Sequence, residues 1–286
     1  MKSLCIKTND SNLLEYLLNE LKNLDLDNVF FSSKTIKHYN NIIIHYKGDN
    51  INKFFSEISS ILCFLVIDIL EENFLNRIIY QNYFYFDKFE RIKILENCFE
   101  LNSENFFELF DKKFSILHSC FLDFISANRN LVLSGFINFR LKDYIKILDS
   151  IVNESVNNFL IEKEYNEFIS LLKLYINTQP INCKAVHIIY SSTNSILLDE
   201  NKNIIDISSD IFKSKYLSDI SFSSNDYILN SLLTLLPNKI FIHLIDNNLD
   251  EFVNTLQLVF ENKVEICTDC SICAIYKNSN KLLIKK

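Results

Sequence analysis

The sequence predicts a helix-rich α/β (α+β) protein with three parts. Apolar residues alternate with a period of two near both ends of the chain, whereas they recur at helical spacing in the middle. The chain has 286 residues and is 48% hydrophobic, which is enough for a packed core. Only two glycines and two prolines are present, so clusters of Asn, Asp and Ser have to mark most turns. We expect a small α/β unit at 1–50, a helical body at 51–179 and an α/β unit at 183–286.

The first 50 residues predict the order β-α-β-β. Leu4 to Lys7 alternate as a strand does, and Ser11 is a plausible N-cap for the amphipathic segment that follows it. Residues 29–33 and 41–48 are rich in β-branched and aromatic side chains, which favours two strands. Gly48 is expected in the turn after them.

Residues 51–179 predict long helices. Two amphipathic stretches cover residues 51–84 and 104–128, and a further helix is expected from Ser134 to about Asn177. Pro180 should end it, because proline lacks the amide hydrogen that a continuing helix uses.

The last third predicts the order β-β-α-β-α-β. Residues 184–191 and 195–206 are typical of a hairpin, and a helix is expected from Asp226 to Leu236, before Pro237. A strand at 240–245 and a helix at 249–262 follow. Residues 264–268, 273–278 and 281–286 are expected to be extended.

The composition excludes several classes of protein. The formal net charge is −7, and no run of Lys or Arg forms a basic face, so we do not expect nucleic acid as a partner. The two glycines, Gly48 and Gly135, are too few for a phosphate-binding P-loop, a GxGxxG dinucleotide motif or a GxSxG nucleophile elbow.

The sequence is typical of a cytoplasmic protein. Its first residues lack the apolar stretch of a signal peptide, and the longest apolar run, Ile61 to Ile67, is too short to span a bilayer. Eight cysteines in such a chain indicate reduced thiols rather than a disulfide framework. The sequence specifies no oligomeric state.

Three of these cysteines form the most specific local motif. In Cys267-Thr-Asp-Cys270-Ser-Ile-Cys273, two residues separate neighbouring thiols, a spacing that lets a tight turn direct the sulfurs at one metal ion. Zinc or an iron–sulfur cluster needs a fourth ligand, for which Cys183, His187 and His243 are the candidates. The alternative is that the three thiols only fill a packed turn.

A second candidate site lies at the start of the third predicted helix. Arg140, Asp143 and Tyr144 are three and four residues apart, so one helix face can present them to a ligand or partner. The alternative is structural, with neighbouring aromatic residues anchoring the helix and Arg140 pairing with an acid. The five histidines show no metal-binding spacing such as HExxH.

Four segments of the sequence are distinctive as strings, namely GFINFRLKDY (135–144), FLIEKEYNEFISLLKLYI (159–176), LLTLLPNKIFIH (232–243) and VEICTDCSIC (264–273). Together they resemble the YtxC-like proteins, which are associated with sporulation in low-GC spore-forming bacteria of clostridial type. The resemblance implies a cytoplasmic protein of a sporulating bacterium. It implies no catalytic residues.

We expect a non-enzymatic binding or regulatory protein with a protein partner. The helical body and the lack of a convergent acid, base and nucleophile favour this function. The alternative is a metal-dependent enzyme or nucleic-acid-processing module in the carboxy-terminal unit, using the cysteine site or the carboxylates of Asp199, Asp206, Asp246 and Asp250. A purely structural scaffold is a third possibility.

Overall fold

A computed structural model describes residues 2–104, 106–191, 195–205, 223–246 and 249–283 of the chain. The predicted α/β class is confirmed, because helices accompany two four-stranded sheets. The chain divides into two compact units, Met1–Glu162 and Lys163–Lys286, and each is described here by itself.

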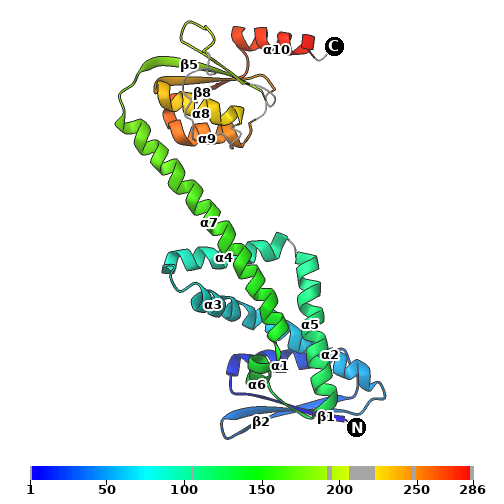
Figure 1. Cartoon of the computed structure of the whole chain (residues 1–286). Coiled ribbons are helices and arrows are strands. Elements are labelled where there is room, and N and C mark those ends of the chain that lie inside the picture. Colours follow the sequence, from blue (N-terminus) through cyan, green and yellow to red (C-terminus); the bar gives the residue numbers. More distant parts are fainter. Residues whose placement is uncertain (1, 105, 192–194, 206–222, 247–248, 284–286) are drawn as a thin grey trace. The chain divides into compact units, whose positions relative to one another are not determined.

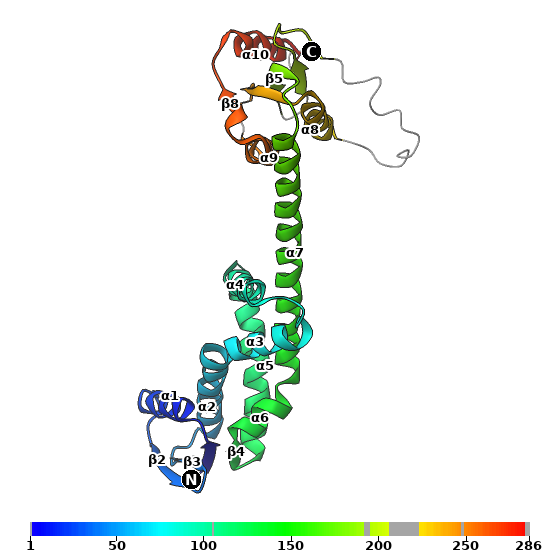
Figure 2. The ribbon, with the colours of Figure 1, turned by 90° about the vertical axis from the view of Figure 1, so that its left-hand side faces the viewer.

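The first unit holds one sheet and most of the helices (Figures 1 and 2). Its elements in chain order are β1 (Lys2–Thr8), α1 (Ser11–Lys22), β2 (Val29–Ile36), β3 (Tyr39–Tyr46), α2 (Ile51–Leu65), the π-helical turn η1 (Val66–Leu70), α3 (Glu71–Asn82), α4 (Lys88–Glu104), α5 (Phe106–Ala127), β4 (Asn130–Val132), α6 (Leu133–Arg140) and the first part of α7 (Lys142–Thr178).

The sheet of this unit has the strand order β2-β3-β1-β4. Strand β3 lies antiparallel between β2 and β1, so the expected β-α-β-β order is confirmed. The short strand β4, which the sequence pattern did not predict, adds in parallel to β1. Helix α1 begins after Asp10, whose carboxylate accepts the backbone N–H groups of Asn12 and Leu13, so the N-cap is Asp10 and not Ser11.

Strands and helices of the first unit share one hydrophobic core. Ile6 of β1, Ile44 of β3, Leu62 of α2 and Leu148 of α7 all belong to the same buried cluster. Residues 1–50 and the helices up to Glu162 therefore form a single compact unit.

The helix expected from Ser134 to Asn177 is two helices. Helix α6 ends at Arg140, and α7 begins at Lys142 after Leu141, whose backbone leaves helical geometry at ψ 28°. Apolar spacing continues across this break, since Leu141 and Tyr144 are both buried, so periodicity alone did not reveal it.

The second unit holds the rest of α7 and the carboxy-terminal elements. They are β5 (Cys183–Tyr190), β6 (Ser195–Leu198), α8 (Ser224–Leu235), β7 (Pro237–Leu244), α9 (Glu251–Phe260), the 3-10 turn η2 (Glu261–Lys263), β8 (Val264–Cys267) and α10 (Ser271–Leu283). The predicted β-β-α-β-α-β order is confirmed up to β8.

The sheet of the second unit has the order β6-β5-β7-β8, with β5, β7 and β8 parallel and β6 antiparallel at the edge. One face carries Ile188 and Ile242 and packs against α7, α8 and α9. Helix α10 lies on the opposite side of the sheet from α8 and α9 (Figures 1 and 2). Among the described side chains, the buried cluster on that side consists of Ile189, Leu198, Ile245 and Ile272.

The extended pieces expected at 273–278 and 281–286 were wrong where the structure describes them, because α10 covers 271–283. Its buried residues Ile272 and Cys273 lie four and three positions before the half-buried Tyr276, the spacing of one helix face, and this packing outweighs the β propensity of the segment. In the described residues no helix is both long and apolar enough to cross a membrane.

Candidate metal centre

Four potential metal ligands meet where β7, β8 and α10 come together. His243 lies near the end of β7, and Cys267 is the last residue of the neighbouring parallel strand β8, directly opposite His243 in the register. After a bend at Thr268–Asp269, Cys270 precedes α10 and Cys273 lies in its first turn. The chain thus brings three thiols and one imidazole to one point.

The ligand atoms of these four residues all lie within 4.8 Å of one another. The Sγ atoms of Cys267 and Cys273 are 3.8 Å apart, and those of Cys270 and Cys273 are 3.6 Å apart. The Nδ1 atom of His243 lies 3.4 Å from Sγ of Cys270 and 3.5 Å from Sγ of Cys273.

These separations match the edges of a tetrahedron around zinc. With Zn–S bonds of about 2.3 Å and Zn–N bonds of about 2.05 Å, ideal tetrahedral geometry separates two sulfurs by about 3.8 Å and a sulfur from a nitrogen by about 3.6 Å. Four of the six ligand–ligand separations are thus close to these values, and the four side chains form a group that could hold a metal ion.

At His243 and Cys270 the protein environment favours the deprotonated forms that bind metal ions. Burial, with the neighbouring His187 and Lys202, lowers the pKa of His243 to about 4, so its imidazole is neutral at physiological pH. Desolvation opposes ionisation of Cys270, but hydrogen bonds from the backbone of Cys273 and from neighbouring thiols lower its pKa overall. One of these is a contact from the Cys273 N–H to Sγ of Cys270 at 3.5 Å.

The thiol of Cys273 lies in a different environment from that of Cys270. Cys273 is 1% exposed, and desolvation raises its pKa to about 11. A metal ion would have to displace the proton of this buried thiol, so binding at this site is coupled to proton release.

Comparisons with known proteins agree with the resemblance of the sequence motifs. The model of the YtxC-like family matches residues 56–265, which is more than half of the chain. The chain belongs to the YtxC-like family. It is also similar to a protein of Bacillus subtilis (strain 168) named "Uncharacterized protein YtxC", with 26% identity over 139 residues. That match covers 47% of this chain and 47% of the relative, and no solved structure matches.

The candidate metal centre lies at the carboxy-terminal boundary of the family match. His187 and His243 lie within the matched residues, whereas Cys267, Cys270 and Cys273 follow directly after residue 265. Membership of the YtxC-like family therefore assigns no role to the three thiols.

Among the three candidates for the fourth ligand, the structure brings His243 to the cysteines. Cys183 begins β5 and pairs with Pro237, six positions along β7 from His243, which is about 20 Å at the usual strand rise. His187 contacts the site indirectly, through a hydrogen bond of its Nδ1 to Nε2 of His243 at 3.0 Å. The register of the strands therefore distinguishes His243 from Cys183 and His187 as the fourth ligand.

The second candidate site of this YtxC-like chain is not assembled as one exposed face. Tyr144 is fully buried and donates a hydrogen bond of 2.5 Å to the carboxylate of Glu71. Asp143 is exposed and pairs with Lys146 at 2.7 Å, while the guanidinium of Arg140 lies over the Phe124 ring. The structural alternative fits only in part: Phe136 is buried and can anchor the helix, but Phe139 is exposed and Arg140 contacts an aromatic ring.

Sequence reasoning missed a buried polar cluster in the first unit. Lys113 contacts Glu71 at 2.7 Å and is 5% exposed, and Asn102 lies within 3.4 Å of both side chains. Glu71, Lys113 and Tyr144 come from three helices, and nothing in their sequence spacing connects them. The cluster ties α3, α5 and α7 together.

The carboxylates of the enzyme alternative have structural partners where they are described. Asp199 accepts the backbone N–H groups of Asn201 and Asn203 in the turn after β6. Asp250 caps α9 and accepts a hydrogen bond from Tyr190. Asp246 follows β7 and is exposed, and Asp206 lies outside the described residues. The metal-dependent enzyme is therefore not favoured.

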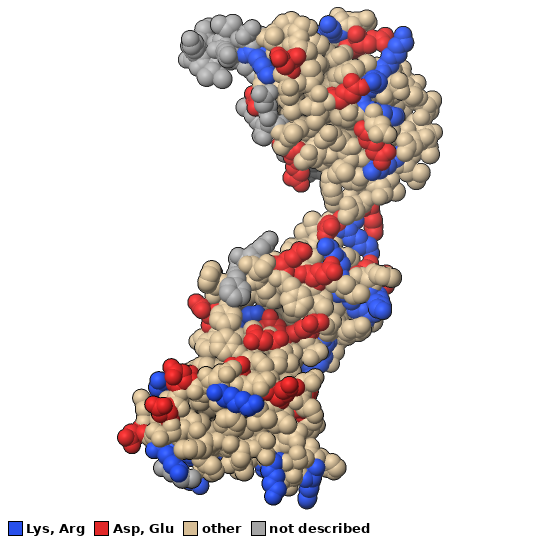
Figure 3. Space-filling model, turned by 180° about the vertical axis from the view of Figure 1, so that it is seen from behind, with Lys and Arg blue, Asp and Glu red and all other residues tan. Residues whose placement is uncertain are grey.

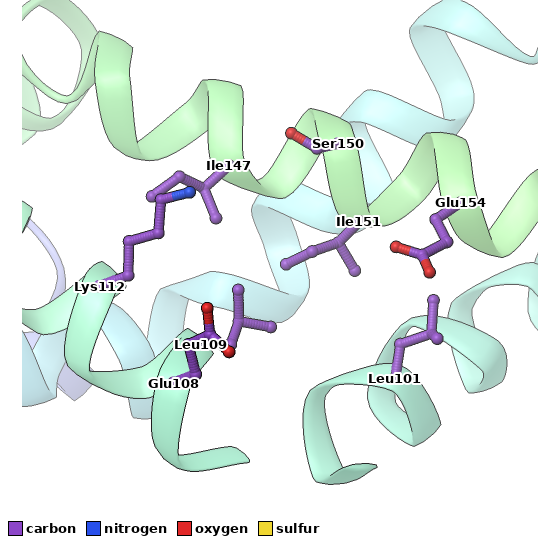
Figure 4. Close-up of a pocket in the computed structure, with 8 residues that line it drawn as sticks. All are labelled: Leu101, Glu108, Leu109, Lys112, Ile147, Ser150, Ile151 and Glu154. Carbon is purple, nitrogen blue, oxygen red and sulfur yellow. The ribbon is translucent and has the colours of Figure 1, made fainter. Parts of the chain in front are cut away.

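A groove of about 260 Å³ lies between α4, α5 and α7 of the first unit (Figure 4). Its lining combines aliphatic and polar side chains, namely Leu101, Glu108, Leu109, Lys112, Ile147, Ser150, Ile151 and Glu154. No thiol or imidazole is among these lining residues, and the hydroxyl of Ser150 donates a hydrogen bond to the backbone carbonyl of Lys146. On the face that Figure 3 shows, basic and acidic side chains alternate over each unit.

Proposed function

We propose that this chain is a binding or regulatory protein whose carboxy-terminal unit is stabilised by one structural zinc ion. The observation that carries the proposal is the closed set of three thiols and one imidazole within 4.8 Å. Four protein ligands at tetrahedral separations are typical of structural zinc sites, whereas catalytic sites keep one position for water or substrate.

The same geometry favours zinc over an iron–sulfur cluster. Ligands of a cluster bind different iron atoms and are usually four cysteines. In this chain one ligand is an imidazole, and the four atoms converge on the volume of a single ion. Zinc is also the metal for which a Cys₃His set is a common structural site.

The fold supports a structural role for the ion. Among the described side chains, the buried apolar cluster on the α10 side of the sheet consists of Ile189, Leu198, Ile245 and Ile272. A metal ion that links β7, β8 and α10 would add to the contacts that hold this helix on the sheet.

The zinc proposal is tested by titrating the reduced full chain with Co²⁺ under anaerobic conditions. We expect one equivalent to produce the strong visible bands of a tetrahedral thiolate site, and one equivalent of Zn²⁺ to abolish them. Weak bands of an octahedral ion, or no saturation near one equivalent, would contradict it.

We further propose a cytoplasmic role in sporulation through a protein partner. The resemblance to sporulation-associated YtxC-like proteins motivates the setting, and the lack of a convergent catalytic set in the described residues motivates binding rather than catalysis. To test this, the gene of the Bacillus subtilis relative would be deleted and this chain supplied in its place.

We expect the deletion to lower the yield of heat-resistant spores and the wild-type chain to restore it. A variant Cys273→Ser should restore it less well than the matched Cys183→Ser. In crosslinking experiments on sporulating cells, we expect a protein partner to be recovered with the wild-type chain but not with the variant Cys273→Ser. An unchanged spore count after deletion would contradict the sporulation role.

A further inference from the structure

We propose that His187 is the positioning residue of the metal centre, which holds the imidazole of His243 with Nδ1 towards the metal. This inference rests on the zinc site proposed above. It assigns a role to a side chain that is not itself a ligand.

Strand register brings the two histidines together. Ile189 of β5 pairs with His243 of β7, so His187, two residues earlier, lies on the same face of the sheet and diagonally opposite His243. Its Nδ1 lies 3.0 Å from Nε2 of His243. The two ring planes are inclined by 19°, which is compatible with a hydrogen bond in the ring planes.

The chemistry of a neutral imidazole determines which of the two histidines donates the hydrogen bond between them. His243 faces the thiols with Nδ1, so as a ligand it carries its hydrogen on Nε2. Because His243 is 3% exposed, this N–H needs a partner inside the protein. Nε2 of His243 therefore donates to Nδ1 of His187, and His187 carries its own hydrogen on Nε2.

The position of His187 is itself supported. Phe241 is directly opposite His187 in the register. Its ring stacks on the imidazole with a centroid distance of 4.9 Å and an angle of 18° between the two ring planes. His187 is half-buried, so the ring contact restricts the plane of a side chain that solvent would otherwise leave mobile. Phe241, His187 and His243 thus form a connected row that ends at the three thiols.

An outer hydrogen bond of this kind fixes the tautomer of a ligand and raises its basicity, and its loss usually weakens metal binding by about 10-fold to 100-fold. We therefore expect His187→Phe, which keeps a ring beside Phe241 but removes the acceptor, to weaken zinc binding by about 10-fold to 100-fold. His187→Gln, whose side-chain oxygen accepts a hydrogen bond, should recover most of the affinity.

The experiment measures the zinc dissociation constant of the full chain by competition with a chromophoric chelator. The matched control is His118→Phe, because His118 is also a partly buried histidine with a hydrogen bond to Ser56, but it lies in the first unit. His118→Phe should leave the zinc affinity unchanged. Circular dichroism of the metal-free variants checks that each is folded.

A second readout separates positioning from general stability. Nitrogen-15 NMR of the zinc-loaded wild type should show His243 bound through Nδ1 with a hydrogen on Nε2. Equal zinc affinity of wild type and His187→Phe, or binding of His243 through Nε2, would overturn the role of His187 while leaving the zinc site intact. A wild-type chain that binds no zinc would overturn both proposals.

Discussion

Nδ1 of His243 lies 3.4 Å from Sγ of Cys270, although 27 residues separate the two in the chain. They meet because β7 and β8 are parallel neighbours and end at the same edge of the sheet. The helix α9 between them returns the chain to the end of the sheet where the strands begin, as in other β-α-β crossovers, and β8 then runs parallel to β7 back to the site. The position of the metal centre is thus a consequence of strand order.

The buried thiol of Cys273 should be the ligand most sensitive to substitution. Cys273→Ser replaces a thiolate by a hydroxyl that binds zinc poorly, so we expect less than about 0.2 equivalents of bound zinc, against about one in the wild type. The apparent melting temperature of the carboxy-terminal unit should fall with it. Cys183→Ser is the control, since Cys183 lies at the other end of the sheet and should change neither quantity.

Removal of the metal should loosen α10 first. Zinc would connect this helix to β7 and β8, so its removal takes away the link between the helix and two strands of the sheet. Amide hydrogens of residues 271–283 should therefore exchange at least about tenfold faster after treatment with a zinc chelator, because the local opening free energy falls. Amides of α2 in the first unit should exchange at the same rate with and without chelator, and faster exchange there would indicate global unfolding instead.

Breaking the buried ion pair Glu71–Lys113 should destabilise the first unit, whereas replacing both residues together should cost much less. Lys113→Met leaves the buried carboxylate of Glu71 without its cation, and we expect a loss of about 3–5 kcal/mol in the free energy of unfolding. The double variant Glu71→Gln/Lys113→Met should recover most of that loss, since no unpaired charge remains and the amide oxygen can still accept the hydrogen bond of Tyr144.

The exposed pair Asp143–Lys146 supplies the control for this experiment. Both side chains are more than 70% exposed, so Lys146→Met should cost less than about 1 kcal/mol. Denaturant unfolding measures all three variants. Similar losses for Lys113→Met and Lys146→Met would show that burial of the first pair has no energetic consequence.

One carboxyl in the first unit predicts a pH dependence of stability. Desolvation, with the charge of Glu71 nearby, raises the pKa of Asp68 above its usual value of 3.8. A carboxyl with a raised folded pKa contributes its full stability below the unfolded pKa and loses it as the pH rises through the folded pKa. The ionised form at pH 7 is therefore the destabilising one.

Asp68→Asn should accordingly raise the free energy of unfolding at pH 7, and the gain should vanish near pH 3. Asp143→Asn is the matched control. The pKa of Asp143 is lowered, chiefly by its hydrogen bond to Lys146, so neutralising it should give no gain at pH 7. Unfolding curves at several pH values compare the two, and a larger gain for Asp143→Asn would contradict the assignment.

Much of the fold could be predicted from local patterns. The alternation in β1 and β3 and the helical spacing in α1, α8 and α9 indicated those elements, and Pro237 marked the end of α8. The pattern failed where local signals conflict with packing. The segment of α10 contains Ile272, Ile275 and Tyr276, residue types that also favour strands, and the break at Leu141 leaves the apolar spacing intact.

The site could be predicted only in part, for a related reason. The spacing of Cys267, Cys270 and Cys273 is a local signal, so the sequence pointed to these residues. The choice of His243 over Cys183 depends on which strands are neighbours and on their register, which sequence spacing does not contain. The partner of His243, His187, lies 56 residues away and follows from the same register.

The most direct test of the central proposal is the metal content and X-ray absorption of the full chain purified without chelator. We predict about one zinc per chain, with three sulfur ligands at about 2.3 Å and one nitrogen at about 2.0–2.1 Å. Less than about half an equivalent of metal with three reduced thiols at positions 267, 270 and 273, or iron with acid-labile sulfide, would contradict it.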